Sequence, residues 1–147
     1  MNLRTHIIVG MGLAGFAVST LDCSIGCYIL ATSISALHHP IIDYASHRHG
    51  RRTILFHSII GAVFLALATS IPFLLFLPPG IVFPLVVASM ASCVSHWLLD
   101  LITIGGVYVV RGRVSLKLFR YDDPLPNISF QAMGFLLLLY SLLVFTS

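Results

Sequence analysis

A histidine and an aspartate four residues apart are the clearest chemical feature of the sequence. His96 and Asp100 lie in the apolar run Ser95-His96-Trp97-Leu98-Leu99-Asp100, and this spacing places both side chains on one face of a helix. Ionisable groups inside such a run are costly unless they are paired or face a polar cavity, so they indicate a functional site. The alternative interpretation is a hydrogen bond between helices that only holds a bundle together.

The element that carries this pair belongs to an unusually apolar chain. Of the 147 residues, 58% are apolar and 9% are charged, and the mean hydropathy is +1.00. A soluble domain has about a quarter charged residues, whereas apolar runs of about twenty residues, which recur here, are long enough to cross a hydrocarbon core of about 30 Å. We therefore predict an integral membrane protein.

We predict an all-α, polytopic transmembrane helix bundle that forms a single domain over residues 1–147. Polar, proline and glycine breaks divide the chain into about five spans, near residues 5–21, 23–42, 54–77, 81–104 and 128–146. The first run also resembles a signal peptide, but we interpret it as the first helix. The last run is interpreted as a plain lipid-facing anchor.

The basic residues indicate an orientation for these spans. With alternate crossings, all eight fall on the side that holds the N-terminus. Because Lys and Arg are enriched in cytoplasmic loops, we expect this side to face the cytoplasm from the cell membrane. At a rise of about 1.5 Å per residue, His96 would lie roughly 12 Å inside its span from this side.

Other histidines and aspartates fall on the same side. His6 begins the first span, Asp43 ends the second, and His57 lies in the first turn of the third. His38 and His39 precede Asp43 by about one helical turn, and we count His39 with the site. The predicted metal ligands are His6, His39, Asp43, His57, His96 and Asp100.

Imidazole and carboxylate ligands together favour zinc, although manganese, iron or another divalent ion would also accept them. The predicted set could hold one ion closely or two ions more openly. His47 and His49 lie in a basic segment, residues 47–52, and are interpreted as part of a solvated cytoplasmic loop.

If the protein is an enzyme, the expected nucleophile is a water activated by the metal. The chain has no glutamate, which excludes a HExxH metalloprotease because that motif needs its glutamate as general base. Asp100 or Asp43 could accept the proton, but a carboxylate bound to metal is a poor base. Asp122 and Asp123 are alternative bases, or they cap a turn before the last helix. The catalytic candidates are Asp100, Asp122 and Asp123.

Two further patterns are interpreted as structural. Gly10-Met11-Gly12-Leu13-Ala14-Gly15 has the form GxGxxG, but its surroundings are wholly apolar, so we expect close helix packing rather than nucleotide binding. Cys23, Cys27 and Cys93 lie in apolar segments and are interpreted as buried small residues without a redox or metal role.

Motifs spread over most of the chain, up to about Pro124, are similar to those of one known family. They are Arg4-Thr5-His6, Arg52-Thr53 with His57-Ser58, and the block Ser95-His96-Trp97-Leu98-Leu99-Asp100-Leu101-Ile102-Thr103. Together they resemble the YdjM-like family of membrane-bound metal-dependent hydrolases. Arg120-Tyr121-Asp122-Asp123-Pro124 is similar to a segment of an archaeal-type branch of that family.

This resemblance implies metal-dependent hydrolysis. The family is distantly similar to zinc-dependent phospholipase C, whose His-x-x-x-Asp zinc motif is similar to His96 and Asp100, and this implies a phosphoester substrate. The chain departs from the family at two positions: Ile41 replaces the first acidic residue of a Pro-Asp-x-Asp motif, and Phe56 replaces a threonine.

The leading hypothesis is a membrane-embedded metal-dependent hydrolase of a phosphoester or lipid-like substrate at the cytoplasmic membrane face. Its expected partners are membrane lipids and a phosphorylated amphiphilic substrate, which the basic loops could hold by charge-assisted hydrogen bonds; no nucleic acid is expected. The alternatives are a non-catalytic metal-binding or transport protein and a small structural subunit of a membrane complex. The sequence leaves the oligomeric state open.

Overall fold

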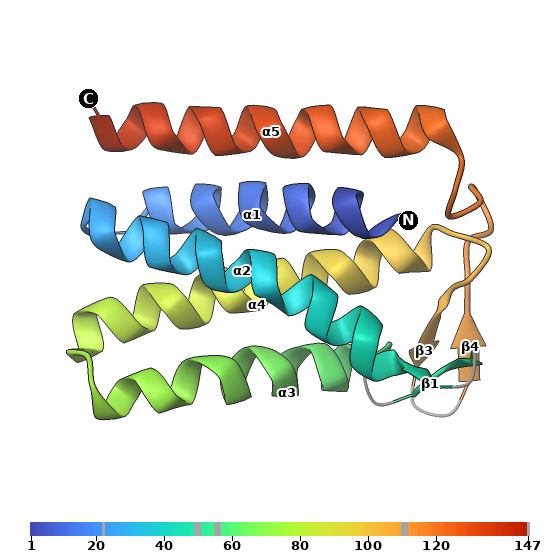
Figure 1. Ribbon diagram of the computed structural model, residues 1–147, viewed down its shortest axis with the longest axis horizontal. Coiled ribbons are helices and arrows are strands. Elements are labelled where there is room, and N and C mark those ends of the chain that lie inside the picture. The colour runs from blue at the N-terminus through green and yellow to red at the C-terminus, as the bar shows by residue number, and fades with distance from the viewer. Residues whose placement is uncertain (22, 49–50, 55–56, 110–111, 147) are drawn as a thin grey trace.

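The structure, a computed structural model, is a helical bundle (Figure 1), as the sequence predicted. It describes residues 1–21, 23–48, 51–54, 57–109 and 112–146, and only the backbone of residues 46–48 and 51–52. Asp22, His49, Phe56 and Arg111 therefore lie outside the described residues. The helices are α1 (Leu3–Ser19), α2 (Ile25–Ser46), α3 (Ile59–Ser70), the 3-10 helix η1 (Ile71–Leu75), α4 (Pro79–Leu101) and α5 (Pro124–Thr146).

The helices run back and forth between two ends of the bundle. The N-terminus, the end of α2, the start of α3, the end of α4 and the start of α5 lie at one end, which we call the polar end. The α1–α2 and α3–α4 turns and the C-terminus lie at the opposite end (Figure 1). Consecutive long helices therefore bring all of the longer polar connections to the same place.

Three helices among the described residues are long and apolar enough to cross a membrane: Ile25–Ala45, Pro79–Leu101 and Pro124–Thr146. Leu3–Ser19 and Ile59–Leu75 are apolar but shorter. The chain is thus compatible with a membrane protein. These three helices are candidate spans by their own length and composition alone.

Two of the differences from the predicted helix boundaries affect the site. α2 continues past Pro40 to Ser46, so Asp43 lies within the helix rather than after it. α3 begins only at Ile59, because Ser58 is its N-cap and accepts a hydrogen bond from the amide of Gly61 (3.1 Å). The placement of His57 in the first turn of a helix was therefore wrong, since it precedes the cap.

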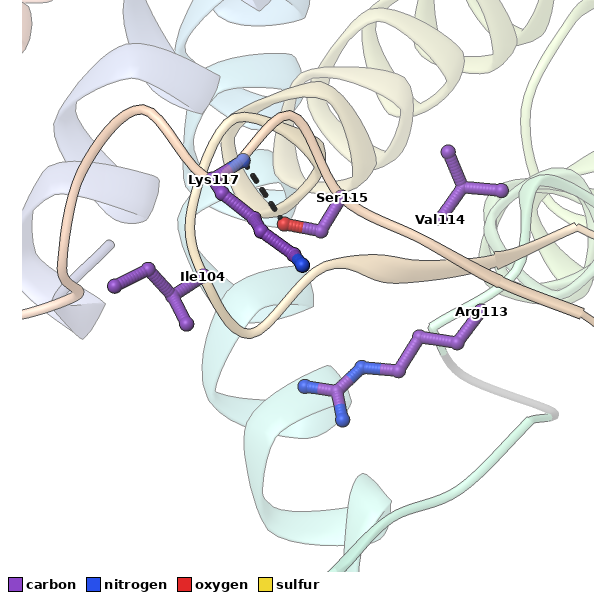
Figure 2. A pocket seen from close by; sticks show the side chains of 5 residues that line it. All are labelled: Ile104, Arg113, Val114, Ser115 and Lys117. Carbon is purple, nitrogen blue, oxygen red and sulfur yellow. Dashed lines mark hydrogen bonds between the residues drawn. The ribbon is translucent and has the colours of Figure 1, made fainter.

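Two short antiparallel hairpins at the polar end were not predicted. β1 (His47–Arg48) pairs with β2 (Arg51–Arg52), and β3 (Val107–Val109) pairs with β4 (Gly112–Val114). The amide of Tyr108 donates to the carbonyl of His57 (2.8 Å), which ties the second hairpin to the segment before α3. The residues around and after β4 border a cavity near the end of α4 (Figure 2).

α5 packs closely on α1, so the interpretation of the last helix as a plain lipid-facing anchor was incomplete. A Cβ atom on Gly12 would lie 2.2 Å from the carbonyl oxygen of Gly134. The Tyr28 hydroxyl bonds Ser141 (2.8 Å) beside Gly15. The glycine pattern therefore serves close helix approach, as predicted, while the rest of α5 is largely exposed.

The cysteines also differ from the prediction. Cys23 and Cys27 form a disulfide at the start of α2, whereas Cys93 is free and buried. The sequence offered little sign of the bond, because one helical turn places two cysteines near each other without showing whether they are oxidised. The disulfide lies at the end of the bundle opposite the polar end.

Candidate metal centre

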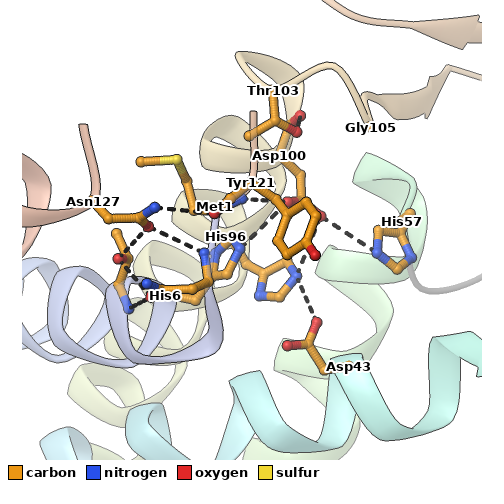
Figure 3. Close-up of polar contacts among 12 residues, drawn as sticks. Met1, His6, Asp43, His57, His96, Asp100, Thr103, Gly105, Tyr121 and Asn127 are labelled. Atoms are coloured by element: carbon orange, nitrogen blue, oxygen red, sulfur yellow. Dashed lines mark hydrogen bonds and ion pairs between the residues drawn. The ribbon is translucent and has the colours of Figure 1, made fainter. Parts of the chain in front are cut away.

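Side chains from several helices meet inside the bundle at its polar end (Figure 3). Two groups have ligand atoms within 4.8 Å of one another: His6 with His39 and His96, and Asp43 with His57 and His96. Asp100 contacts both groups. The structure thus brings together all six residues that the sequence proposed as ligands, and we call them the His/Asp cluster.

The cluster residues come from α1, α2, α4 and the segment before α3. His6 lies in the second turn of α1, whose N-cap Asn2 accepts from the amide of Thr5 (2.9 Å). Asp43 lies beyond Pro40 in α2, and His57 precedes the cap of α3. The histidines of the His/Asp cluster and Asp100 are at most 2% exposed, whereas the Asp43 side chain is 31% exposed. Asp43 is therefore the member of the cluster nearest to solvent.

Asp100 is the carboxylate at the centre of the cluster. Its Oδ1 lies 3.3 Å from His6 Nε2 and 3.4 Å from the amine of Met1. Its Oδ2 lies 3.4 Å from His57 Nε2 and 3.7 Å from His96 Nε2. A buried carboxylate must be paired or coordinated to offset its desolvation. Asp100 therefore attracts positive charge to the cluster, and the amine of Met1 supplies one such charge.

A chain of hydrogen bonds couples the tautomers of His39 and His96. Ser92 Oγ lies 3.2 Å from the carbonyl oxygen of Ser35 and 3.1 Å from His39 Nε2, and His39 Nδ1 lies 3.0 Å from His96 Nδ1. When the single Ser92 hydroxyl hydrogen is donated to Ser35, Ser92 accepts from His39 Nε2–H, His96 Nδ1–H donates to His39, and Nε2 of His96 carries a lone pair. When it is donated to His39, the roles reverse and Nε2 of His96 carries the proton. The first pattern is the one that suits a metal ion.

In that first pattern the lone pair of His96 Nε2 faces two carboxylates. Nε2 of His96 is buried and has no hydrogen-bond partner among the described residues. It lies 3.7 Å from Asp43 Oδ1 and 3.7 Å from Asp100 Oδ2. Three lone-pair donors this close together repel one another unless a proton or a metal ion lies between them. The cluster could therefore hold a metal ion, and its donor atoms fit a divalent one.

His96 belongs to both groups, which limits how ions could occupy the cluster. A neutral imidazole has one lone pair, so His96 can complete only one group at a time. The His6 and His96 rings stack with centroids 3.9 Å apart. His39 is hydrogen-bonded to His96 rather than aimed at the carboxylates, which gives it the geometry of a residue that orients a ligand.

The remaining candidates lie elsewhere. Asp122 is paired with Arg120 Nε (3.5 Å), and Asp123 Oδ2 accepts from the amide of Arg120 (2.7 Å) in the turn before α5. Neither aspartate belongs to the two groups found in the described part of the chain. Nε2 of His38 lies 2.7 Å from the Thr69 hydroxyl, so this buried histidine serves the α2–α3 contact.

The sequence reasoning missed three residues that position the cluster. Ser92 is four residues before His96, so a polar stripe of spacing four along α4 could have identified it. Gly10 admits His39, since a Cβ atom there would lie 1.9 Å from His39 Nε2. Asn127 Oδ1 accepts from the amide of Asn2 (3.1 Å) and from Thr5 Oγ1 (2.7 Å), which fixes α1 at its start. No local sequence pattern predicted this contact between α5 and the start of α1.

The fold and the cluster define a class: a helical bundle with apolar helices long enough to span a membrane and a buried group of imidazoles and carboxylates that could hold a metal ion. Comparisons add no particular relative, because no family model, curated protein or solved structure matches the chain.

Proposed function

We propose that the protein is a membrane-embedded, metal-dependent hydrolase that cleaves a phosphoester of an amphiphilic substrate at the cytoplasmic membrane face. The observation that carries this proposal is the buried Nε2 of His96, which has no hydrogen-bond partner among the described residues and lies 3.7 Å from a carboxylate oxygen of Asp43 and of Asp100. The resemblance of the histidine motifs to the YdjM-like family supports hydrolysis in particular.

In this proposal the ion is zinc, held by Asp43, His57, His96 and Asp100. His39 orients His96, and His6 lies against the other oxygen of Asp100 and completes the site. A second ion held by His6, His39 and His96 would have to replace the bond between His39 and His96. Such an ion supplies a water whose pKa falls toward neutrality.

The protein residues then have to receive a proton and hold the substrate. Asp100 is the proposed proton acceptor, because its two oxygens lie among the imidazoles. A carboxylate that holds the ion is a weaker base, so Asp122 and Asp123 are the alternatives. Basic residues of the polar end would bind the substrate phosphate by charge-assisted hydrogen bonds.

The proposed topology has five spans with the N-terminus in the cytoplasm of a cell membrane. α1 and the segment 59–75 are short for membrane spans. In this topology they cross the membrane because they pack against the longer helices of the bundle. Two features support the orientation: the basic residues gather toward the polar end in sequence, and the disulfide lies at the opposite end, since disulfides persist outside the cytoplasm.

Metal analysis of purified full-length protein tests the proposal. We expect zinc or another divalent ion in stoichiometric amount and its loss in His96→Ala. His38→Ala is the matched control, because His38 is also a buried histidine but belongs to neither group. Phosphate release from a phosphoester lipid should stop with chelator and return with zinc.

Each outcome separates the hypotheses. Metal without turnover of any phosphoester lipid would favour a non-catalytic metal-binding protein. Wild-type protein that binds no divalent ion would favour a structural subunit, in which the bond between His39 and His96 only joins α2 to α4. Equal metal loss in His38→Ala and His96→Ala would contradict the ligand assignment.

A further inference from the structure

A second polar feature lies at the polar end, apart from the His/Asp cluster. A cavity of about 460 Å³ is bordered by the segment after α4 and by β4 with the residues that follow it (Figure 2). Its lining contains two cations, one hydroxyl group and no carboxylate among the described residues. The lining residues are Ile104, Arg113, Val114, Ser115 and Lys117.

The backbone around this cavity is held firmly. The amides of Leu116 and Leu118 donate to the carbonyls of Leu101 (2.9 Å) and Ile102 (3.0 Å) at the end of α4. Ser115 Oγ donates to the carbonyl of Thr103. These bonds satisfy carbonyl groups that a helix end otherwise leaves without partners. The cavity wall is therefore part of the fold rather than a loose loop.

Arg113 is oriented for binding an anion. Its Nε (2.6 Å) and its Nη2 both donate to the carbonyl of Gly105, which fixes one edge of the guanidinium group. A guanidinium has five N–H donors, so the others can face the cavity. Figure 2 shows this group and the Lys117 ammonium directed toward the same space.

Lys117 has an unusual backbone conformation for a lysine. Its φ is +52°, the only positive φ of a non-glycine residue in the described part of the chain. This left-handed region disfavours side chains with a Cβ atom, and glycine is the usual occupant. Non-glycine residues in such conformations cluster at ligand-binding and active sites, so this position is a candidate for ligand binding.

The surroundings of the cavity are apolar and exposed. Ile104, Val114, Leu116 and Leu118 are 52, 44, 54 and 61% exposed. Polar and apolar side chains therefore alternate along residues 113–118, and two of the three polar ones are basic, as in segments that lie at a membrane interface. A ligand in this place meets cations and exposed hydrocarbon together, which suits a lipid phosphate better than a free anion.

We propose that this cavity binds the phosphate of an anionic lipid headgroup, with Arg113, Ser115 and Lys117 as its donors and the exposed leucines against the acyl chains. The proposal deepens the proposed function, and rests on it for the membrane placement, by assigning the part of the protein that holds the phosphate. Binding itself needs no metal ion.

The test uses the purified full chain in detergent after chelator treatment. Thermophoresis would measure binding of dioctanoyl phosphatidic acid, of dioctanoylglycerol, which lacks the phosphate, and of inorganic phosphate. We expect phosphatidic acid to bind at least tenfold more tightly than either of the others. Arg113→Gln should weaken its binding about tenfold, the loss of a charge-assisted hydrogen bond.

Lys117→Gly separates binding from folding. Glycine accepts the left-handed conformation, so the melting temperature should be unchanged or higher while phosphatidic acid binding falls about tenfold. Arg4→Gln is the control, because Arg4 is an exposed cation of the polar end that does not line the cavity. Its affinity for phosphatidic acid should be unchanged.

Three outcomes would overturn the assignment: equal affinity for phosphatidic acid and dioctanoylglycerol, equal affinity for inorganic phosphate, or an equal loss in Arg4→Gln. The first would leave no phosphate recognition, the second would indicate a free-anion site, and the third only a general attraction. The two proposals can fail separately. Absence of hydrolytic turnover would contradict the proposed hydrolase, whereas phosphatidic acid binding after chelator treatment would still support the cavity.

Discussion

At the residue scale, the orientation of His96 depends on His39 and Ser92, which lie behind it. The hydrogen bonds of His39 with Ser92 Oγ (3.1 Å) and with His96 Nδ1 (3.0 Å) hold the imidazole of His96 with its Nε2 toward the carboxylates. Groups that bond the second nitrogen of a ligating imidazole fix its tautomer and typically change metal affinity about 10–100-fold when lost. The site therefore depends on contacts outside its own ligand atoms.

Gly10→Ala tests this dependence without removing any polar group. The new Cβ atom would lie 1.9 Å from His39 Nε2 and 2.9 Å from Ser92 Oγ, so His39 must move. We expect divalent-metal affinity to fall about 10–100-fold, measured by titration of chelator-treated protein with zinc. The ring of His39 would no longer hold His96 in place.

The control is Gly80→Ala, because a Cβ atom there meets nothing within 4 Å. It should leave metal affinity unchanged. Circular dichroism should show equal helix content in both variants. If Gly10→Ala binds zinc as tightly as the wild type, His39 does not position the cluster.

The sequence could predict which residues form the cluster but not how they bond. His96 and Asp100 share a helix face at spacing four, and alternate helices bring His6 and Asp43 to the same end. The tautomer of His96 could not be predicted, because it depends on Ser35 and Ser92 across two helices. Such contacts follow from the packing of helices rather than from local spacing.

At the element scale, α5 is attached to α1 by backbone contact and by a buried amide. Gly12 and Gly134 let the two helices approach closely. Asn127, only 3% exposed, joins the start of α5 to Asn2 and Thr5. The glycine pattern in the sequence indicated where α1 permits a close neighbour. It did not identify that neighbour, because small residues are equally compatible with any apolar helix.

Gly134→Val should weaken the packing of α5 on α1. A Cβ atom at this position would already lie 2.8 Å from the carbonyl oxygen of Ile8 and 2.8 Å from Val9 Cα, and backbone atoms cannot yield as a flexible side chain does. Overpacking of this kind costs about 1–3 kcal/mol. We expect a lower melting temperature in detergent.

Ala132→Val is the matched control, since Ala132 is exposed on the same helix. It adds the same kind of side chain without meeting α1 and should melt like the wild type. Equal destabilisation of both variants would indicate a general intolerance of α5 to β-branched residues, and the proposed contact would then not account for the effect.

At the scale of the whole molecule, the two ends of the bundle differ in chemistry. The His/Asp cluster, both hairpins and the cavity lined by Arg113 and Lys117 lie at the polar end, and the disulfide lies at the other. Hydropathy and basic residues predicted this separation, because apolar runs of similar length must alternate in direction. The hairpins were not predicted, since two- and three-residue strands leave no periodic pattern.

The separation of the ends makes the membrane topology testable in intact cells that express the full chain. The native thiols offer little background, because Cys23 and Cys27 are paired and Cys93 is buried. Gly112→Cys places an exposed thiol at the polar end, and Gly80→Cys places one in the first turn of α4 at the opposite end; a Cβ atom has room at both positions. A membrane-impermeant maleimide should label Gly80→Cys before lysis and Gly112→Cys only after it, because basic residues favour the cytoplasmic side. The reverse pattern would contradict the orientation, and labelling of both before lysis would contradict the crossing of α4.

The disulfide gives a second test of the orientation. Alkylation without reductant, followed by mass spectrometry, should leave Cys23 and Cys27 unmodified, because an end of the bundle outside the cytoplasm keeps its disulfide. Two free thiols at these positions would remove that support for the orientation.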